Sequence, residues 1–209
     1  MGIILTMPLL VLVRHGQSLW NLENRFTGWI DVPLTPQGET EARQAGELLR
    51  NTPLDVAYTS ALKRAAHTLE LILETVPVQL PVVSDKALNE RDYGDLAGFQ
   101  KDDMRKTYGE AQVHIWRRSY DVAPPSGESL KDTKARTVPF FERAIMGDIR
   151  QGKNVLVVAH GNSNRSIVME LEKMTPERIL ALELPTGVPR VYDLADDGSV
   201  RSVKVLGQS

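Results

Sequence analysis

Residues 8–16, PLLVLVRHG, pass from an unbroken apolar run into a charged tripeptide. The apolar part, 8–13, is short and partly β-branched, which is typical of a strand covered on both faces within a parallel sheet. Arg14, His15 and Gly16 follow where this strand ends. Ligands of open α/β sheets bind at the carboxyl ends of the strands, so His15 lies where a site is expected. We expect Gly16 to let the backbone approach a ligand closely.

A second apolar run has the same ending. Residues 154–159, NVLVVA, lead into His160 and Gly161. Two strands that end alike can bring both imidazoles into one pocket, where one acts as nucleophile and the other donates to oxygens of a transferred group. A buried structural histidine is the alternative for His160, but the repeated context favours the paired site.

Helical patterns separate these strands from weaker strand candidates at 55–58 and 81–84. Thr35 and Pro36 predict the start of a helix that reaches about Arg50. We expect Ser60 to cap a helix that ends near Glu74. Ser129 or Thr133 begins a long helix that extends to about residue 150.

The alternation of strands and helices predicts an α/β fold. We expect a three-layer sandwich with a mostly parallel mixed sheet and helices on both faces. Val188–Leu194 and Val200–Leu206, separated by Asp196, Asp197 and Gly198, predict a terminal hairpin and therefore at least one antiparallel strand. The segment 88–127 is irregular and predicts short helices and loops over one end of the sheet. Residues 1–209 are expected to form a single domain.

Composition excludes several classes of protein. The chain has no cysteine, so it has no disulfide, thiol nucleophile or thiolate metal site. Its formal net charge of -2 argues against a globally basic nucleic-acid-binding surface. No stretch approaches the ~18 apolar residues of a membrane helix, and the apolar run 3–13 lacks the basic residues that precede a signal sequence. The four histidines show no metal-like pairing, and no Walker loop is present.

Basic residues form the second part of the predicted site. Arg64 follows the strand candidate 55–58 and therefore lies at the same end of the sheet as His15. Further cations fall in the irregular segment above that end: Arg91, Lys101, Arg117 and Arg118. A guanidinium offers planar, bidentate donors to phosphate, so we expect some of these groups to bind substrate anions.

Glu90 is the carboxylate that we single out, in a loop directly after the strand candidate 81–84. Phosphoryl transfer between hydroxyl groups needs a group that protonates and deprotonates the alcohol. Asp92 and Asp95 compete with Glu90 for this role. Nearby arginines should lower the pKa of Glu90, so we expect it to be ionised before an anionic ligand binds.

Taken together, these motifs resemble a known family. LVRHGQS at 12–18, NRFTGW at 24–29, YTSALKRA at 58–65 and LNERDYG at 88–94 are similar to the 2,3-bisphosphoglycerate-dependent phosphoglycerate mutases of the histidine phosphatase superfamily. WRR at 116–118, AHGNS at 159–163 and LPTGVP at 184–189 continue the match in order. The short link between WRR and GESL resembles the shorter form of the mutase. Asn164 departs from the pattern, where an apolar residue is expected.

The resemblance implies a role for each matching residue. His15 is the phosphorylated nucleophile and Glu90 the general acid and base. Arg14, Arg64 and His160 hold the transferring phosphoryl group, helped by Asn21 and the amide of Gly161. The remaining matches bind the glycerate, its carboxylate and its second phosphate: Thr27, Gly28, Tyr93, Lys101, Arg117, Arg118 and Asn162.

The resemblance also implies the reaction and its surroundings. 3-Phosphoglycerate and 2-phosphoglycerate are interconverted, with 2,3-bisphosphoglycerate as the phosphoryl primer and no metal. We expect small-molecule phosphoglycerates as partners, no nucleic acid or membrane, a monomer or small homo-oligomer, and a cytoplasmic location. Minor bisphosphoglycerate phosphatase or synthase activity is a further expectation. A phosphatase of the same superfamily and a non-catalytic binder of phosphorylated ligands are the alternatives.

Overall fold

The computed structural model describes residues 8–195 and 197–207 of the chain. Their six-stranded sheet has the order β3-β2-β4-β1-β5-β6. The strands are β1 (Leu9–Arg14), β2 (Val56–Thr59), β3 (Val82–Ser84), β4 (Val155–Ala159), β5 (Arg190–Leu194) and β6 (Val200–Val205). From β3 to β1 the neighbours are parallel, whereas β5 is antiparallel to both β1 and β6. The predicted mixed sheet and terminal hairpin are confirmed, and Asp196 of the predicted turn lies outside the described residues.

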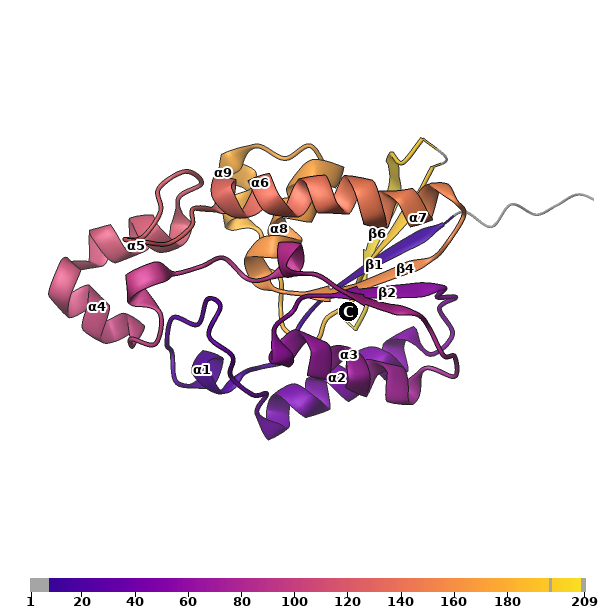
Figure 1. Cartoon of the computed structure of the whole chain (residues 1–209), viewed down its shortest axis with the longest axis horizontal. Helices are drawn as coiled ribbons and strands as arrows, with labels where there is room; N and C mark the ends of the chain where they lie inside the picture. The colour runs from indigo at the N-terminus through magenta and orange to yellow at the C-terminus, as the bar shows by residue number, and fades with distance from the viewer. Residues whose placement is uncertain (1–7, 196, 208–209) are drawn as a thin grey trace, which may run out of the picture.

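Helices cover both faces of this sheet (Figure 1). One layer contains α2 (Pro36–Leu49) and α3 (Lys63–Thr75). The other contains α6 (Leu130–Phe140), a π-helical segment (Phe141–Ile145), α7 (Met146–Arg150), α8 (Gly161–Leu171) and α9 (Pro176–Ala181). Beyond one end of the sheet lie α1 (Leu19–Leu22), α4 (Lys101–Tyr108) and α5 (Glu110–Arg118), with short 3₁₀ turns at Lys86–Leu88 and Gly94–Leu96. The predicted three-layer sandwich is confirmed.

The packing of strand β1 explains why its sequence is continuously apolar from Leu9 to Val13. Leu10 and Leu12 pack in the cluster that includes residues of α6, α7 and α8. Val11 and Val13 pack on the opposite face, with residues of α2 and α3. Successive side chains of a strand point to opposite faces, so a strand between two helical layers needs an apolar residue at every position. Burial of each such side chain stabilises the fold by about 1.5–3 kcal/mol.

The helix boundaries follow local signals with two differences. Thr35 accepts a hydrogen bond from the Gly38 amide and caps α2 as predicted. Of the two candidates for the start of the long helix, Ser129 is the cap, and it forms a capping box with Asp132. The helix does not continue regularly to residue 150. Pro139 lacks an N–H and removes an intrahelical hydrogen bond, and the π-helical segment begins two residues later, at Phe141.

Ser60 differs from its predicted role as a helix cap. Helix α3 begins at Lys63, and its N-cap residue Leu62 makes no side-chain capping bond. The Ser60 hydroxyl instead lies 2.7 Å from Nε2 of His160 and accepts a hydrogen bond from the Leu62 amide. The prediction was wrong because the hydroxyl of a serine before a helix can either cap the helix or form a hydrogen bond with a distant side chain, and here it contacts His160.

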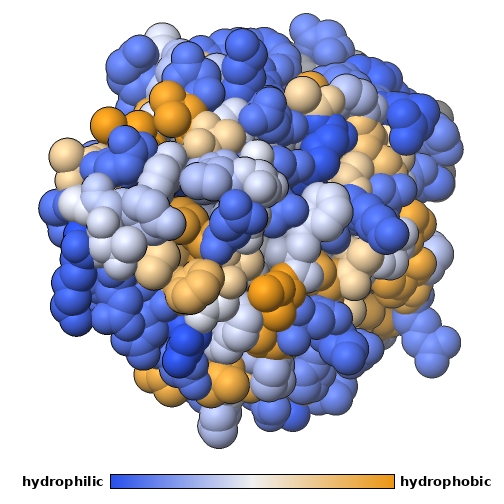
Figure 2. Space-filling view, turned by 60° about the vertical axis from the view of Figure 1, so that its left-hand side comes forward, coloured by the Kyte–Doolittle hydropathy of each residue, from blue (hydrophilic) through white to orange (hydrophobic). Residues whose placement is uncertain are grey.

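Figure 2 brings the end of the molecule with α4 and α5 forward and shows scattered apolar residues among hydrophilic ones. Phe99 and Tyr108 are among the exposed large side chains. Among the helices of the described residues, none combines the length and apolar character needed to cross a membrane.

Candidate active site

His15 and His160 lie together because β1 and β4 pair in register. Arg14 pairs with Ala159, so the next residue of each strand is a histidine. The His15 amide donates to the Ala159 carbonyl at 3.0 Å. The two imidazole rings meet edge to face, with centroids 4.9 Å apart. The predicted pairing of the two strand-His-Gly segments is confirmed.

The imidazole of His15 is held in one orientation. Its Nδ1 lies 2.7 Å from the Gly16 carbonyl oxygen, which can only accept, so Nδ1 carries the proton. Nε2 is then the nitrogen with the lone pair. Burial, followed by the charges of Arg64 and Arg14, lowers the pKa of His15 well below its ordinary value. The ring is therefore neutral at physiological pH, as a nucleophile must be.

His160 is fully buried, and its Nε2 is bonded to Ser60. Burial is again the main cause that lowers its pKa well below the ordinary value, followed by the nearby charge of Arg64. Two neutral imidazoles can lie in contact without charge repulsion, which two imidazolium rings could not do.

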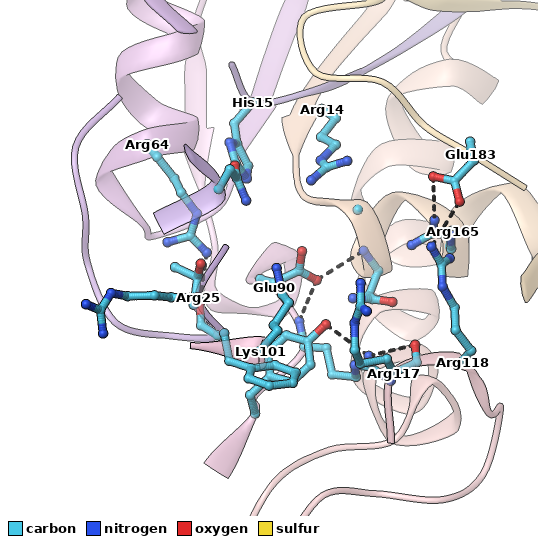
Figure 3. Close-up of a pocket in the computed structure, with 18 residues that line it drawn as sticks. Arg14, His15, Arg25, Arg64, Glu90, Lys101, Arg117, Arg118, Arg165 and Glu183 are labelled. Carbon is cyan, nitrogen blue, oxygen red and sulfur yellow. Dashed lines mark hydrogen bonds and ion pairs between the residues drawn. The ribbon is translucent and has the colours of Figure 1, made fainter. Parts of the chain in front are cut away.

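A pocket of about 220 Å³ opens beside His15. It is lined by predicted site residues from six segments of the chain: Arg14, His15, Asn21, Thr27, Gly28, Arg64, Glu90, Tyr93, Lys101, Arg117, Arg118, Gly161 and Asn162. It is also lined by Arg25, Phe26, Arg91, Arg165 and Glu183. Of the predicted catalytic residues, His160 alone is not among the described residues that line it. In Figure 3, His15 and Arg64 lie opposite Arg165 and Arg118, with Glu90 between them.

Backbone carbonyls orient the arginines next to His15. Arg64 is 1% exposed and donates to the carbonyls of Gly28 at 2.8 Å and Ile30 at 3.1 Å. Burial lowers the pKa of Arg64 to about 10. Arg14 donates through Nη1 to the Leu184 carbonyl at 3.0 Å, while its buried Nε has no partner among residues 8–195 and 197–207. Carbonyls fix these guanidinium groups without neutralising them, so both remain able to bind an anion.

Glu90 is tied down by backbone amides. Its Oε1 accepts from the Arg91 amide at 2.8 Å and from the Asn162 amide at 3.0 Å. Burial raises the pKa of this carboxyl group, but the Arg91 amide, Arg14, Arg64 and Asn162 together hold it below its ordinary value. Glu90 is therefore ionised in the free protein. Its predicted competitors differ: Asp92 and Asp95 do not line the described pocket.

Trp29 and Arg136 fix the backbone of the same loop. The Trp29 indole N–H donates to the Glu90 carbonyl at 2.6 Å, and Arg136 Nη2 donates to it at 2.8 Å. Arg136 also lies over the Trp29 ring, 5.4 Å from its centroid, and forms an ion pair with Glu128 at 2.8 Å. These contacts fix the position of the Glu90 backbone.

Cationic side chains crowd the outer part of the pocket. Arg91 lies over the Tyr93 ring, 4.7 Å from its centroid, and donates to the Tyr93 hydroxyl and the Arg117 carbonyl. The buried Nε of Arg91 has no partner in the part of the chain that the structure describes. Burial, helped by the charge of Arg117, lowers the pKa of Lys101 to about 8. Cations crowded in this way are stabilised by an anion, so the outer part is suited to bind one.

The two glycines that follow the histidines have different roles. A Cβ at Gly161, the first residue of α8, would lie 3.6 Å from Glu90 Oε2 and 3.7 Å from Arg14 Nε. The helix N-terminus therefore faces the site openly. A Cβ at Gly16 would lie 2.1 Å from the Gly38 carbonyl oxygen. The expectation that Gly16 serves close approach of a ligand was wrong, because the backbone of α2 occupies that space.

Comparison with known proteins assigns the family. Residues 10–204 match the histidine phosphatase superfamily, branch 1. The chain belongs to this superfamily. It is 59% identical over 197 residues to the 2,3-bisphosphoglycerate-dependent phosphoglycerate mutase of Afipia carboxidovorans, covering 93% of this chain and 95% of that one. The mutase of the same name from Rhizobium etli is 58% identical over 201 residues, covering 95% of each chain.

Solved structures of other proteins share the fold. YhfR of Bacillus stearothermophilus superimposes with a TM-score of 0.84 at 28% identity, covering 97% of this chain and 98% of that chain. A mycobacterial glucosyl-3-phosphoglycerate phosphatase gives a TM-score of 0.81 at 27% identity, covering 97% and 100%. A protein named as a phosphatase therefore has the same fold as this chain.

Three charged residues that line the pocket were not assigned to the site from the sequence. Arg165 lies one helical turn after Gly161 on α8, and this spacing is a signal that could have found it. Arg25 lies within the NRFTGW motif but was not assigned a role. Glu183 carries no local signal, because only the path of the chain between α9 and β5 brings it to the pocket.

Asn164, the departure from the family pattern, has a structural account. Its side chain is 2% exposed, and its Nδ2 donates to the Val13 carbonyl at 3.1 Å. It therefore ties α8 to β1 next to the two histidines.

Within the part of the chain that the structure describes, no group of three or more histidine, aspartate or glutamate side chains is arranged to hold a metal.

Proposed function

We propose that this chain is a 2,3-bisphosphoglycerate-dependent phosphoglycerate mutase that interconverts 3-phosphoglycerate and 2-phosphoglycerate through a phosphohistidine at His15. One observation carries the proposal: a neutral imidazole with a free Nε2 lies in the same pocket as Arg14, Arg64 and the carboxylate of Glu90. A nucleophile, an anion clamp and an acid–base group are what phosphoryl transfer between hydroxyls needs. Residues 1–209 act as one domain in this proposal.

The lining of the pocket fits a ligand with several negative charges. Eight cationic side chains face two carboxylates across it. The buried Nε atoms of Arg14 and Arg91 lack partners within the described chain, as expected of donors that await an anion. 2,3-Bisphosphoglycerate, when bound, supplies the phosphoryl group that primes His15. Arg14, Arg64 and the amide of Gly161 would hold one of its phosphates, and Lys101, Arg117 and Arg118 the opposite end.

Phosphorylated His15 donates its phosphoryl group to the free hydroxyl of the glycerate and then accepts the phosphoryl group from the other position. The P–N bond at Nε2 breaks as an O–P bond to the free hydroxyl of the substrate forms. Arg14 and Arg64 stabilise the charge on the equatorial oxygens in that transition state. His160, in ring contact with His15, completes the inner end of the site. Asn21 is placed beside this end by the capping box that its side chain forms with Ser18.

Glu90 handles the proton of the hydroxyl group. In the free protein its pKa is low, so it is ready to accept that proton as the P–O bond forms. A bound phosphate reverses the local field of the arginines, which raises the affinity of Glu90 for the proton. The same group then returns the proton when His15 removes the other phosphoryl group.

The remaining pocket residues bind and orient the glycerate: Thr27, Gly28, Tyr93, Lys101, Arg117, Arg118 and Asn162. Enclosure among these groups keeps water from the phosphohistidine while the substrate reorients. We assign the activity to the cytoplasm, with small phosphoglycerates as partners and with a monomer or small homo-oligomer as the working form. The chemistry routes no step through a metal.

The test is an assay of 3- and 2-phosphoglycerate interconversion, with and without added 2,3-bisphosphoglycerate and in the presence of a chelator. Turnover that requires the bisphosphate and ignores the chelator supports the proposal. Release of inorganic phosphate without isomerisation would instead make the chain a phosphatase, as its 27% identical mycobacterial neighbour is named. Binding without either reaction would make it a non-catalytic module.

A further inference from the structure

Three consecutive residues between α9 and β5 meet arginines of the pocket. The Leu182 carbonyl accepts from Nε and Nη2 of Arg165 at 3.0 and 2.9 Å. The Leu184 carbonyl accepts from Nη1 of Arg14 at 3.0 Å. These two neutral contacts orient the guanidinium groups. The residue between them, Glu183, brings a negative charge to the same place.

The carboxylate of Glu183 bridges two cations. Its Oε1 lies 3.0 Å from Nη2 of Arg118, and its Oε2 lies 3.8 Å from Nη2 of Arg165. Figure 3 shows the Glu183 side chain directed at both groups from the rim of the pocket. The side chain of Glu183 is 67% exposed, whereas that of Arg165 is 11% exposed. An exposed carboxylate is thus paired with a nearly buried cation.

Glu90 and Glu183, the carboxylates that line the described pocket, differ in how firmly their side chains are held. Glu90 is 9% exposed, and two backbone amides fix its Oε1. Within the described residues, the contacts of the Glu183 carboxylate are to the side chains of Arg118 and Arg165, and its side chain is 67% exposed. An exposed ion pair contributes little to stability, so its separation costs little when another anion takes its place.

We propose that Glu183 is an internal anion that occupies Arg118 and Arg165 in the empty enzyme and competes with the substrate for them. A ligand displaces it only when its own anionic group binds those arginines. Every ligand whose anionic group binds Arg118 and Arg165 pays this cost, so Glu183 lowers the affinity of the pocket for such anions. Glu183 is in this way an affinity-determining residue of the pocket. The identity of the ligand rests on the proposed function, but the displacement does not.

The alternative is that Glu183 braces the two arginines in their binding positions. The two roles predict opposite effects of Glu183→Gln, which removes the charge and keeps the shape. If the carboxylate competes, its loss strengthens binding of anions. If it braces, its loss weakens binding.

The test measures binding by calorimetry with two probes, 3-phosphoglycerate and inorganic pyrophosphate. Glu183→Gln should bind both about three- to tenfold more tightly than the unaltered chain, and the gain should shrink as salt is added. Glu177→Gln is the matched control, since it removes the same charge from an exposed position on α9 outside the described pocket. It should bind both probes as the unaltered chain does. Equal or weaker binding by Glu183→Gln would overturn the proposal.

A second variant pair locates the effect. In an Arg118→Ala background, Glu183→Gln should gain less affinity, because one of the shielded cations is gone. A full gain in that background would contradict shielding of Arg118. Pyrophosphate separates this inference from the proposed function. If the chain does not isomerise 3-phosphoglycerate, the mutase function fails, yet the pyrophosphate affinities of the variants still decide the role of Glu183.

Discussion

The imidazole ring of His160 meets that of His15 edge to face at 4.9 Å, and its Nε2 lies 2.7 Å from the Ser60 hydroxyl. This chain of contacts joins the ends of three neighbouring strands, β1, β4 and β2. The nucleophile is thus supported from within the sheet, while the anion-binding side chains approach it from the helices and loops outside. The two parts of the site can be tested separately.

Removal of the Ser60 hydroxyl should destabilise the protein. Ser60→Ala leaves Nε2 of a fully buried imidazole without its partner, at a cost of about 1–3 kcal/mol in the free energy of unfolding. Urea unfolding measures this change. Ser166→Ala is a matched control, because this equally buried serine donates only to a helix carbonyl, and its loss should cost less than about 1 kcal/mol. Equal costs for the two variants would contradict the special role of the Ser60–His160 contact.

Removal of the Glu90 charge should slow the reaction and spare binding. Glu90→Gln retains an acceptor for the Arg91 and Asn162 amides but cannot take the hydroxyl proton. We expect kcat to fall by roughly 10²–10⁴-fold with a dissociation constant for 3-phosphoglycerate that does not rise. Steady-state kinetics and calorimetry provide the two values. Near-normal turnover would assign the acid–base role to another group.

The two glycines should respond oppositely to alanine. Gly16→Ala forces a Cβ to 2.1 Å from the Gly38 carbonyl, so stability should fall by more than about 3 kcal/mol or folding should fail. Gly161→Ala meets only ordinary contacts and should keep its stability. Its methyl group enters the space between Glu90 and Arg14, so kcat/KM should fall by roughly tenfold or more. Thermal unfolding together with the isomerisation assay tests both. A stable Gly16→Ala protein would show that α2 can move away.

Stability should decrease in mild acid because of the two buried histidines. Their pKa values are lower in the folded state than in the unfolded chain, so the unfolded chain binds more protons below about pH 6.5. Their contribution is therefore present above that pH and is lost as the pH falls. Each histidine adds up to about 1.4 kcal/mol per pH unit to the slope. Glu90, whose pKa is also lowered, adds a further loss at more acidic pH.

Urea unfolding between pH 7.5 and 5.5 measures that slope. His15→Asn should reduce it by up to about 1.4 kcal/mol per pH unit. The same measurement on His114→Gln, which replaces an exposed histidine, serves as the control. Parallel slopes for His15→Asn and the unaltered chain would show that His15 titrates normally in the folded protein.

The central part of the site was predictable because its signals are local. Each histidine follows directly on an apolar strand, and parallel strands necessarily end at the same edge of a sheet, so His15 and His160 had to be neighbours. Arg64 follows from the same rule. The part of the pocket beyond this edge was less predictable. Lys101 and Arg117 could be named only as cations of the irregular segment, some of which were expected to bind an anion, and the family resemblance gave them their roles.

The rest depended on long-range packing. No residue near Gly16 in the sequence indicates that the Gly38 carbonyl will occupy the space that a Cβ at position 16 would need. Ser60 has the residue type of a helix cap, yet a histidine 100 residues away uses its hydroxyl. Glu183 reaches Arg118 across 65 residues of sequence separation. In each case a local signal was absent or compatible with two roles, and only the packed chain decides between them.

The phosphorylation state of His15 tests the account most directly. The protein is incubated with 2,3-bisphosphoglycerate, digested under neutral conditions, and analysed by mass spectrometry for acid-labile phosphate, with His15→Asn as the control. We predict one phosphoryl group, on the peptide that contains His15, and none in the variant. A chain that turns over phosphoglycerate while His15 remains unmodified, or that carries the phosphate on another residue, would contradict the account.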